Sequence, residues 1–438
     1  MARAQHEVVV VGGGVSGLTA ALALADAGVG VAVLEARARL GGRIATGDVG
    51  GLPVERGGEF LDDVDGPFPR LLDRLGLQRA PAFHAKQPGG GAVVLGGIVT
   101  VPSEQALALA GALDDEIDAI ARTLDPDAPW DASDAAVLDA QSLAGFVAAQ
   151  GGGGEALALV EALHAVGGST VSTSEMSLLA MAAKQALRGP RAGRLTLRLA
   201  GGAEAFARAA AEQLEHRVVL GATAVRITHD TAGVEVELSD GRRIAARVAI
   251  VAVPLAPARA LAISPLPRHA RLEALAELRT GHVVKAHVAF ATPWWRESSP
   301  AFVPAITDSA CGSVYEGPVG HPGAVLSCFV GAAPAQELLR RSPAKRELAV
   351  LRALERAAGG GFPEPPIGVR LDCWNELPET AGSYLVLRPG ELTRHRDALR
   401  RHDGNVVYAG AEASTSPSFI AGAAEAGSRS AEVARSLL

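Results

Sequence analysis

A glycine-rich turn near the N-terminus constrains the fold of this chain more than any other feature. Residues 8–11 are four consecutive valines, and such a run of β-branched residues indicates a buried strand. Gly12, Gly14 and Gly17 follow in the spacing Gly-x-Gly-x-x-Gly. Gly12 permits a tight turn, Gly14 lets the backbone approach a pyrophosphate, and Gly17 lets the next helix pack closely on the sheet. We therefore predict a Rossmann-like unit that binds a dinucleotide at a helix N-terminus.

The residues that follow complete this unit. Residues 19–27 are strong helix formers, Gly28 is placed to end the helix, and residues 30–34 are typical of a second buried strand. Glu35 comes at the tip of that strand, where a carboxylate can accept hydrogen bonds from ribose hydroxyls. An acid at this position favours an unphosphorylated ribose, so the sequence favours FAD or NAD over NADP.

Two further glycine pairs distinguish between FAD and NAD as the predicted cofactor. Residues 39–43 read Arg-Leu-Gly-Gly-Arg, and residues 55–60 read Glu-Arg-Gly-Gly-Glu-Phe. Paired glycines permit close backbone approach to a ligand, and the forked donors of Arg43 suit phosphate oxygens. These motifs resemble the second flavin-binding stretch of the flavin monoamine oxidase and polyamine oxidase family. In that family a Gly-Gly-Arg loop holds the pyrophosphate and the next Gly-Gly pair lies against the isoalloxazine, which favours FAD.

The resemblance continues to the C-terminus and covers nearly the whole chain. Trp374 is followed by Ala-Gly-Ser-Tyr at 381–384, Arg-Pro-Gly at 388–390, Tyr-Ala-Gly-Ala-Glu-Ala-Ser at 408–414 and Phe-Ile-Ala-Gly-Ala at 419–423. This order and spacing are similar to the family's closing pattern. The resemblance implies that Glu412 lies near the ribityl and phosphate part of the flavin. It also implies that the helix starting near Ile420 points its N-terminus at the pyrimidine edge, where its dipole stabilises reduced flavin.

The same resemblance assigns an aromatic pair to the substrate. Tyr384 and Phe419 stand where the family places two rings that flank the substrate in front of the flavin. Phe419 replaces a tyrosine, so the pocket is expected to be less polar. Ser383 occupies a position where some family members have a cysteine bonded to the flavin. We therefore expect FAD to be bound non-covalently. Packing in the core is the alternative role for each ring.

Lysine is rare in this chain, since only four of its 41 basic residues are lysines, namely Lys86, Lys184, Lys285 and Lys345. Lys285 lies in segment 282–290, which alternates like a strand. In the resembling family a lysine before a Pro-Trp-Trp-like segment, here 293–295, holds a water at flavin N5 and assists the reaction with oxygen. The resemblance thus implies a catalytic role for Lys285, and a lysine that extends from the strand to solvent is the alternative.

The resemblance implies a full set of site residues. The catalytic positions are Lys285, Tyr384 and Phe419. The backbone near Ala224 is expected against the adenine. The positions expected to bind the cofactor are Gly12, Gly14, Ser16, Gly17, Glu35, Ala36, Gly42, Arg43, Gly57, Gly58, Glu59, Ala224, Trp374, Gly410, Glu412 and Ile420.

The chain of 438 residues is long for one hydrophobic core, so we expect two domains. The predicted fold class is α/β, with a Rossmann-like FAD-binding domain interleaved with an α+β substrate-binding domain of the monoamine oxidase type. The FAD-binding domain is expected from segments 1–77, 198–277 and 372–438. The substrate domain is expected from segment 78–197, with helices at 103–124, 142–149, 155–166 and 174–187 that line the pocket, and from segment 278–371, with strands and one helix at 344–357.

Composition excludes several other classes of protein. The net charge of −7 without a basic run argues against binding to nucleic acid. No apolar run has membrane-spanning length, and the first strand begins near residue 7, which leaves no room for a signal peptide. These features predict no membrane association and a cytoplasmic location. The three cysteines suggest neither a disulfide framework nor a zinc site, and we expect no metal. A homodimer is the default expectation.

The resemblance implies an FAD-dependent amine oxidase. In such an enzyme a hydride passes from the α-carbon of a small-molecule amine to flavin N5, an imine forms, and O2 is reduced to H2O2. Three alternatives stay open. An L-amino-acid oxidase of this fold typically has an arginine soon after the Gly-Gly segment, where this chain has Phe-Leu-Asp-Asp at 60–63. A desaturase or porphyrinogen-type flavoenzyme shares the N-terminal motifs, and a non-catalytic flavin-binding protein would keep them without a reactive pocket.

Overall fold

The computed structural model describes residues 6–61, 66–82, 91–189, 196–298, 302–317, 324–415 and 417–438. Lys86 and the acidic pair Asp62 and Asp63 lie outside these residues.

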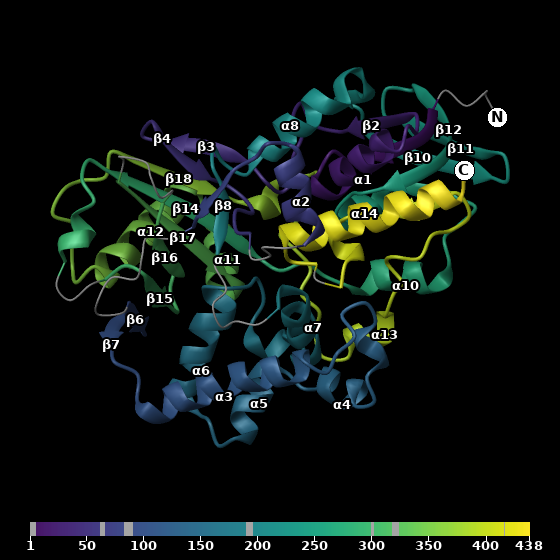
Figure 1. Ribbon diagram of the computed structural model, residues 1–438. Helices are drawn as coiled ribbons and strands as arrows, with labels where there is room; N and C mark the ends of the chain where they lie inside the picture. The colour runs from purple at the N-terminus through teal and green to yellow at the C-terminus, as the bar shows by residue number, and fades with distance from the viewer. Residues whose placement is uncertain are drawn as a thin grey trace.

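The glycine-rich turn follows β1, an inner strand of a large sheet whose strands β2, β10, β11 and β12 are labelled in Figure 1. The strand order is β13-β10-β11-β12-β1-β2-β9, and β19 also pairs with β12. The strand β1 runs parallel to β12 and β2 on its two sides, so the carboxyl ends of the three strands meet at one edge. The strands are β1 (His6–Val11), β2 (Val31–Glu35), β9 (Val218–Leu220), β10 (Ala224–Asp230), β11 (Gly233–Leu238), β12 (Arg243–Val251), β13 (Ala262–Ser264) and β19 (Val406–Tyr408).

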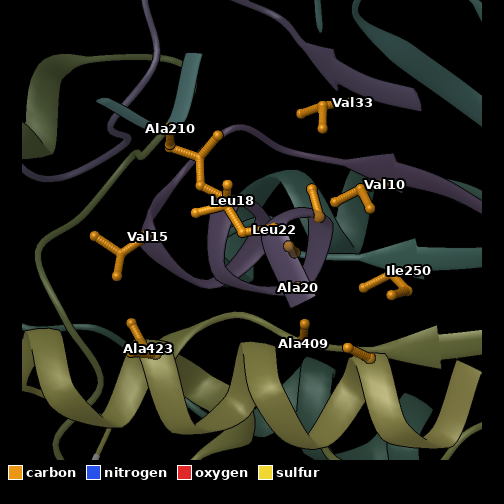
Figure 2. Close-up of a cluster of buried hydrophobic side chains, with 14 of the residues drawn as sticks. Val10, Val15, Leu18, Ala20, Leu22, Val33, Ala210, Ile250, Ala409 and Ala423 are labelled. Atoms are coloured by element: carbon orange, nitrogen blue, oxygen red, sulfur yellow. The ribbon is translucent and has the colours of Figure 1, made fainter. Parts of the chain in front are cut away.

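Two helices from opposite ends of the chain pack together on this sheet. Helix α1 (Val15–Asp26) and helix α14 (Ile420–Ser436) lie side by side in Figure 1, and α8 (Glu204–Leu214) also contacts α1. A Cβ on Gly427 of α14 would lie 2.3 Å from the carbonyl oxygen of Ser16, so the close approach of the two helices requires glycine there. Figure 2 shows part of the core between the sheet and the helices, and Leu18 and Leu22 of α1 belong to the same buried cluster as Val10 and Ile250 of the sheet.

A second sheet forms a separate layer, on the left of Figure 1. Its strand order is β18-β14-β17-β16-β15-β6-β7, and all pairs except β15 with β6 are antiparallel. The central strand β14 (Val283–Phe290) is buried along its whole length. The other strands are β6 (Ala92–Leu95), β7 (Ile98–Thr100), β15 (Ala305–Thr307), β16 (Ser313–Glu316), β17 (Ala324–Gly331) and β18 (Gly368–Asp372). The prediction of one α-helix in segment 278–371 is wrong, because α11 (Ala332–Leu339) follows β17 directly and precedes α12 (Pro343–Ala357).

A layer of helices lies below both sheets in Figure 1. It contains α3 (Glu104–Ala121), α4 (Ala135–Ala140), α5 (Leu143–Ala149), α6 (Gly154–Val160) and α7 (Leu178–Arg188). The hydroxyls of Ser103, Ser142 and Ser177 accept hydrogen bonds from first-turn amides of α3, α5 and α7. Residues 161–166 continue α6 as a π-helical turn. The predicted helix at 174–187 starts later than expected, since Ser177 caps it and Thr173–Glu175 form a 3₁₀ turn.

Short elements connect these layers. They are the hairpin β3 (Thr46–Val49) and β4 (Leu52–Glu55), the pair β5 (Arg79–Pro81) and β8 (Leu197–Leu199), and the helices α2 (Pro67–Arg74), α9 (Leu255–Ala260), α10 (His269–Glu277) and α13 (Glu391–His395). Among the residues described above, no helix has the length and apolar character needed to span a bilayer. The strands of the first sheet come from segments 1–77, 198–277 and 372–438. The division of the chain into two domains stays a prediction.

Candidate functional site

A cavity of about 600 Å³ lies at the carboxyl edge of the first sheet and extends to the second sheet. Its volume is in the range of small-molecule and cofactor sites. Most of the predicted site residues line it, although they come from distant parts of the chain. They are Gly12, Gly14, Ser16, Glu35, Ala36, Gly42, Arg43, Gly57, Gly58, Ala224, Lys285, Trp374, Tyr384, Gly410, Phe419 and Ile420. Gly17, Glu59 and Glu412 are not part of the lining.

The three glycines of the first turn have different reasons to be glycine. A Cβ on Gly17 would lie 1.9 Å from the carbonyl oxygen of Gly12, and a Cβ on Gly12, whose φ is +109°, would lie 2.6 Å from that of Ala252. Packing of the protein itself therefore requires these two glycines. Gly14 has an ordinary φ of −79°, and its Cβ would meet only Gly42 Cα at 3.7 Å. The fold tolerates alanine at Gly14, so the free space above it is space that a ligand can use.

The N-terminus of α1 faces this space. Gly14 is the N-cap of α1 and supplies no side-chain cap, and Gly14, Val15 and Ser16 all line the cavity. The Ser16 hydroxyl accepts a hydrogen bond from the Gly410 amide at 2.9 Å, which joins the first turn to the C-terminal segment. A helix N-terminus with uncapped amides favours an anion such as a pyrophosphate.

Glu35 reaches the same cavity from the tip of β2. Its two carboxylate oxygens accept hydrogen bonds from the amides of Gly13 and Arg37, at 2.8 and 3.0 Å. The residue is buried, with 5 % of its surface exposed. These bonds fix the orientation of the carboxylate in a cavity wall that Ala36 and Ala224 also line, and its recognition of a ribose stays a prediction.

The Arg43 side chain has a protein partner that the sequence did not predict. Its two terminal nitrogens donate to the two carboxylate oxygens of Glu412 at 2.6 and 3.1 Å, and one of them also donates to the Ser383 carbonyl at 2.7 Å. The forked donors of Arg43 are therefore occupied by Glu412. Binding of phosphate by Arg43, and of the flavin chain by Glu412, stays a prediction.

The end of the cavity near the second sheet is aromatic. Tyr384, Phe419 and Trp374 line it, as does Phe329 of β17. Burial raises the pKa of the Tyr384 hydroxyl, so this group stays neutral. Phe329 could not be predicted from the sequence as a cavity residue, because an apolar residue in a strand is normally interpreted as core. Its position follows only from the strand register, which pairs it with Lys285 of β14.

The helical layer contributes differently from what the sequence suggested. The described lining contains no residue of α3 to α7. Instead, the ammonium of Lys184 and the guanidinium of Arg188, both on α7, lie 4.5 and 4.6 Å from the centre of the Phe419 ring. Two cations are thus packed on the ring of Phe419, within the range of cation–π contact, although neither is among the described lining residues.

Lys285 reaches the cavity wall from β14, with 4 % of its surface exposed, and forms an ion pair with Glu59 at 2.8 Å. This burial does not fit a lysine that extends to solvent.

Glu55 is a second buried acid behind the cavity, and it gives a prediction for the pH dependence of stability. Its Oε1 atom accepts hydrogen bonds from the Thr46 hydroxyl at 3.2 Å and the Ala203 amide at 3.1 Å. Burial, followed by the charge of Glu59, raises its pKa from 4.5 to about 7. A folded-state pKa above the unfolded value means that the contribution of Glu55 to stability is complete below pH 4.5 and is lost between pH 4.5 and 7.

Glu55→Gln is therefore expected to leave stability nearly unchanged at pH 4.5 and to raise the free energy of unfolding at pH 8, by roughly 3 kcal/mol at most. Glutamine keeps the acceptor oxygen without the charge. Urea unfolding of the apoprotein at the two pH values measures this difference, with Glu337→Gln on the exposed face of α11 as the control. An equal effect of Glu55→Gln at both pH values would contradict the raised pKa.

Comparison with known proteins identifies a family, related sequences and related structures. Residues 15–434 match the family of flavin-containing amine oxidoreductases. AofH of Mycobacterium tuberculosis, named as a flavin-containing monoamine oxidase, is 31% identical, and the match covers 99% of this chain and 97% of that protein. A solved structure of putrescine oxidase with bound putrescine superposes with a TM-score of 0.88 at 25% identity, over 98% of this chain and 99% of that one. Cyclohexylamine oxidase from Brevibacterium oxydans gives 0.85 at 26% identity and the same coverage. These similarities confirm the family resemblance and the predicted fold class.

Proposed function

We propose that this chain, an FAD-dependent amine oxidase of the family of flavin-containing amine oxidoreductases, oxidises a monoamine with O2 as the electron acceptor. The placement of FAD in the cavity is supported by the space that a Cβ on Gly14 would fill, beside the uncapped N-terminus of α1. Ser383 stands where a cysteine would be needed for a covalent bond, so the FAD is non-covalent.

The residues present fit this cofactor. The α1 N-terminus would hold the pyrophosphate, Glu35 the ribose of the adenosine, and Gly57 and Gly58 would admit the isoalloxazine near Lys285. FAD supplies the redox chemistry, because it can accept a hydride equivalent from the α-carbon of an amine. The protein supplies binding, orientation and exclusion of water.

The aromatic end of the cavity suits a neutral amine. Tyr384 and Phe419 would confine the substrate between two rings, and Phe329 and Trp374 add apolar surface that displaces water. The raised pKa of Tyr384 keeps its hydroxyl protonated, so Tyr384 does not take up a proton from the amine. The substrate would therefore lose its ammonium proton to solvent before it binds.

A cytoplasmic location and a homodimeric state stay predictions.

The proposed substrate class follows from the two cations on α7. Lys184 and Arg188 contact the Phe419 ring, and a second ammonium group on a diamine would have to approach them. At a separation of about 8 Å and an effective dielectric constant near 20, each like-charge pair costs roughly 2 kcal/mol. We therefore propose a monoamine for this chain. The putrescine in the solved structure of putrescine oxidase is a ligand of that protein.

A series of amines with matched chain length tests this proposal. Primary monoamines are expected to react with kcat/KM at least about tenfold higher than diamines of equal length. Each O2 consumed should yield one H2O2 and one carbonyl product. An oxygen electrode with a peroxide assay measures both quantities.

The double variant Lys184→Met with Arg188→Met should reduce the difference in kcat/KM between monoamines and diamines. Lys345→Met, at an exposed position on α12, is the matched control. Diamines that react faster than monoamines in the parent protein, or selectivity unaltered in the double variant, would contradict the proposed substrate class. Failure of every amine to react would contradict the conclusion that this chain is an amine oxidase.

A further inference from the structure

A second cavity, of about 590 Å³, adjoins the cavity described above. The two cavities share a wall, since Arg37, Trp374 and Glu379 line both. A cavity of this volume can hold a small molecule, and its lining determines which kind. Five of the residues that line it are arginines, namely Arg37, Arg39, Arg56, Arg346 and Arg370.

Two of the acids in this lining are already bound by arginines. The Asp372 carboxylate accepts from Nε of Arg56 at 2.8 Å and from Nε of Arg370 at 2.9 Å. Glu376 accepts from a terminal nitrogen of Arg346 at 2.8 Å. One carboxylate, that of Asp372, thus serves two guanidinium groups, and positive charge remains in excess around Arg56.

Arg37 and Arg56 keep their terminal nitrogens available for a ligand. Arg37 approaches Glu35 through its Nε atom, at 3.6 Å, and Arg56 also binds its acid through Nε. Among the described residues, the terminal nitrogens of these two arginines have no hydrogen-bond partner. Arg37 follows β2 and Arg56 follows β4, so two separate loops bring these donors to one cavity.

Arg39 adds a third positive charge close to these two. Its terminal nitrogens donate to three backbone carbonyl oxygens of residues 40–44, which fixes the guanidinium group. Burial, followed by the charge of Arg37, lowers the pKa of Arg39, and Arg56 acts in the same direction against two nearby acids. An anion that binds among the three guanidinium groups would relieve their mutual repulsion.

This arrangement matches a phosphate group. A guanidinium group is a planar fork of donors that binds phosphate oxygens in pairs, and a phosphate group offers three acceptor oxygens and more than one negative charge. The first turn of α12 adds to the attraction, because Pro343 lines the cavity and the N-cap residue Ser342 supplies no side-chain cap. The positive end of the α12 dipole therefore lies at the cavity.

We propose that the second cavity binds a phosphate-bearing small molecule in addition to the FAD of the first cavity. This site is separate from the one proposed for the FAD pyrophosphate, because Arg39 and Arg56 line the second cavity only. Trp374 connects the two sites, since it lines both and its Nε1 atom donates to the Arg56 carbonyl oxygen at 2.8 Å. The proposal goes beyond amine oxidation and does not depend on it.

Titration calorimetry of the FAD-loaded protein with inorganic pyrophosphate tests this site, at an ionic strength held constant with sodium chloride. We expect saturable binding of one pyrophosphate per chain. Arg56→Gln should raise the Kd at least about tenfold with FAD still bound, because a hydrogen bond to a charged group is lost. Arg243→Gln removes an arginine from an exposed ion pair with Glu235 and is the matched control, with an unchanged Kd.

A variant of opposite sign is available in the same lining. Glu347 and Glu379 also line the cavity, and their charges repel an anion. Glu347 is exposed on α12, so Glu347→Gln should fold normally and lower the Kd for pyrophosphate by about twofold. Glu337→Gln, at an exposed position on α11 outside the lining, should leave the Kd unchanged. This pair decides the question even if Arg56→Gln does not fold.

Three results would overturn the proposal. They are pyrophosphate binding to the apoprotein alone, which would mean that the anion occupies the place of the FAD pyrophosphate, an equal Kd in Arg56→Gln and Arg243→Gln, and heats no larger than those of sodium chloride. Titrations with AMP and with inorganic phosphate then distinguish a phosphate ester from a free anion as the ligand. Failure of every amine to react would contradict the proposed function, while these titrations would still decide the role of the second cavity.

Discussion

Tyr384→Ala and Phe419→Ala are each expected to lower the limiting rate of amine-driven flavin reduction by about tenfold or more. The two rings line the aromatic end of the cavity, and removal of one leaves room for the amine to turn away from the flavin. Correct alignment of reactants can be worth ~7 kcal/mol or more of the barrier, so a partial loss of alignment is costly. Anaerobic stopped-flow measurement of flavin absorbance gives the limiting rate directly.

Two controls distinguish orientation from general damage. Tyr384→Phe keeps the ring and should cost much less than Tyr384→Ala. Phe146→Ala removes an aromatic ring from α5 that is not among the described lining residues, and it should leave the limiting rate unchanged. If both cavity alanine variants fold, retain FAD and are reduced at the parent rate, the aromatic pair does not orient the substrate.

The second large effect is expected at Gly14. Gly14→Ala should fold with nearly parental stability, since its Cβ meets only Gly42 Cα at 3.7 Å. The added methyl group would occupy the space proposed for the pyrophosphate, and we expect the Kd for FAD to rise by about a hundredfold, which corresponds to roughly 3 kcal/mol. Fluorescence titration of the apoprotein with FAD measures the affinity, and urea unfolding measures the stability.

Other glycines supply matched comparisons for this variant. Gly111→Ala on α3, where a Cβ has nothing within 4 Å, should affect neither quantity. Gly17→Ala should lower stability itself, because its Cβ would lie 1.9 Å from the Gly12 carbonyl oxygen. An alanine at Gly14 that binds FAD with the parental Kd would show that the pyrophosphate does not lie above this residue.

The features that the sequence predicted well depend on local patterns. The valine run of β1, the glycines of the first turn and the tip of β2 each carry their own conformational preference, so the βαβ unit could be identified without any long-range contact. Helix α14 begins at Ile420, where the motif placed it. The boundary of α7 was less accurate, because Ser177 and the upstream Ser172 are both suitable N-caps.

The features that the sequence did not predict depend on contacts between distant segments. The pairing of Arg43 with Glu412 joins the two ends of the chain, and neither motif indicates that its charged residue binds the other. The ion pair of Glu59 with Lys285 was not predicted either; Glu59 is not among the described lining residues, and its expected contact with the cofactor stays a prediction. The cations on Phe419 come from α7, whose helical periodicity indicates a buried face but not the residue that it meets.

The most direct test of the central claim is anaerobic addition of a primary monoamine to the purified holoprotein, with the absorbance of the flavin followed over time. We expect complete loss of the oxidised flavin band, with one carbonyl product formed per flavin and the oxidised spectrum restored when O2 is admitted. A flavin that stays bound and oxidised in the presence of every amine in the series would contradict it.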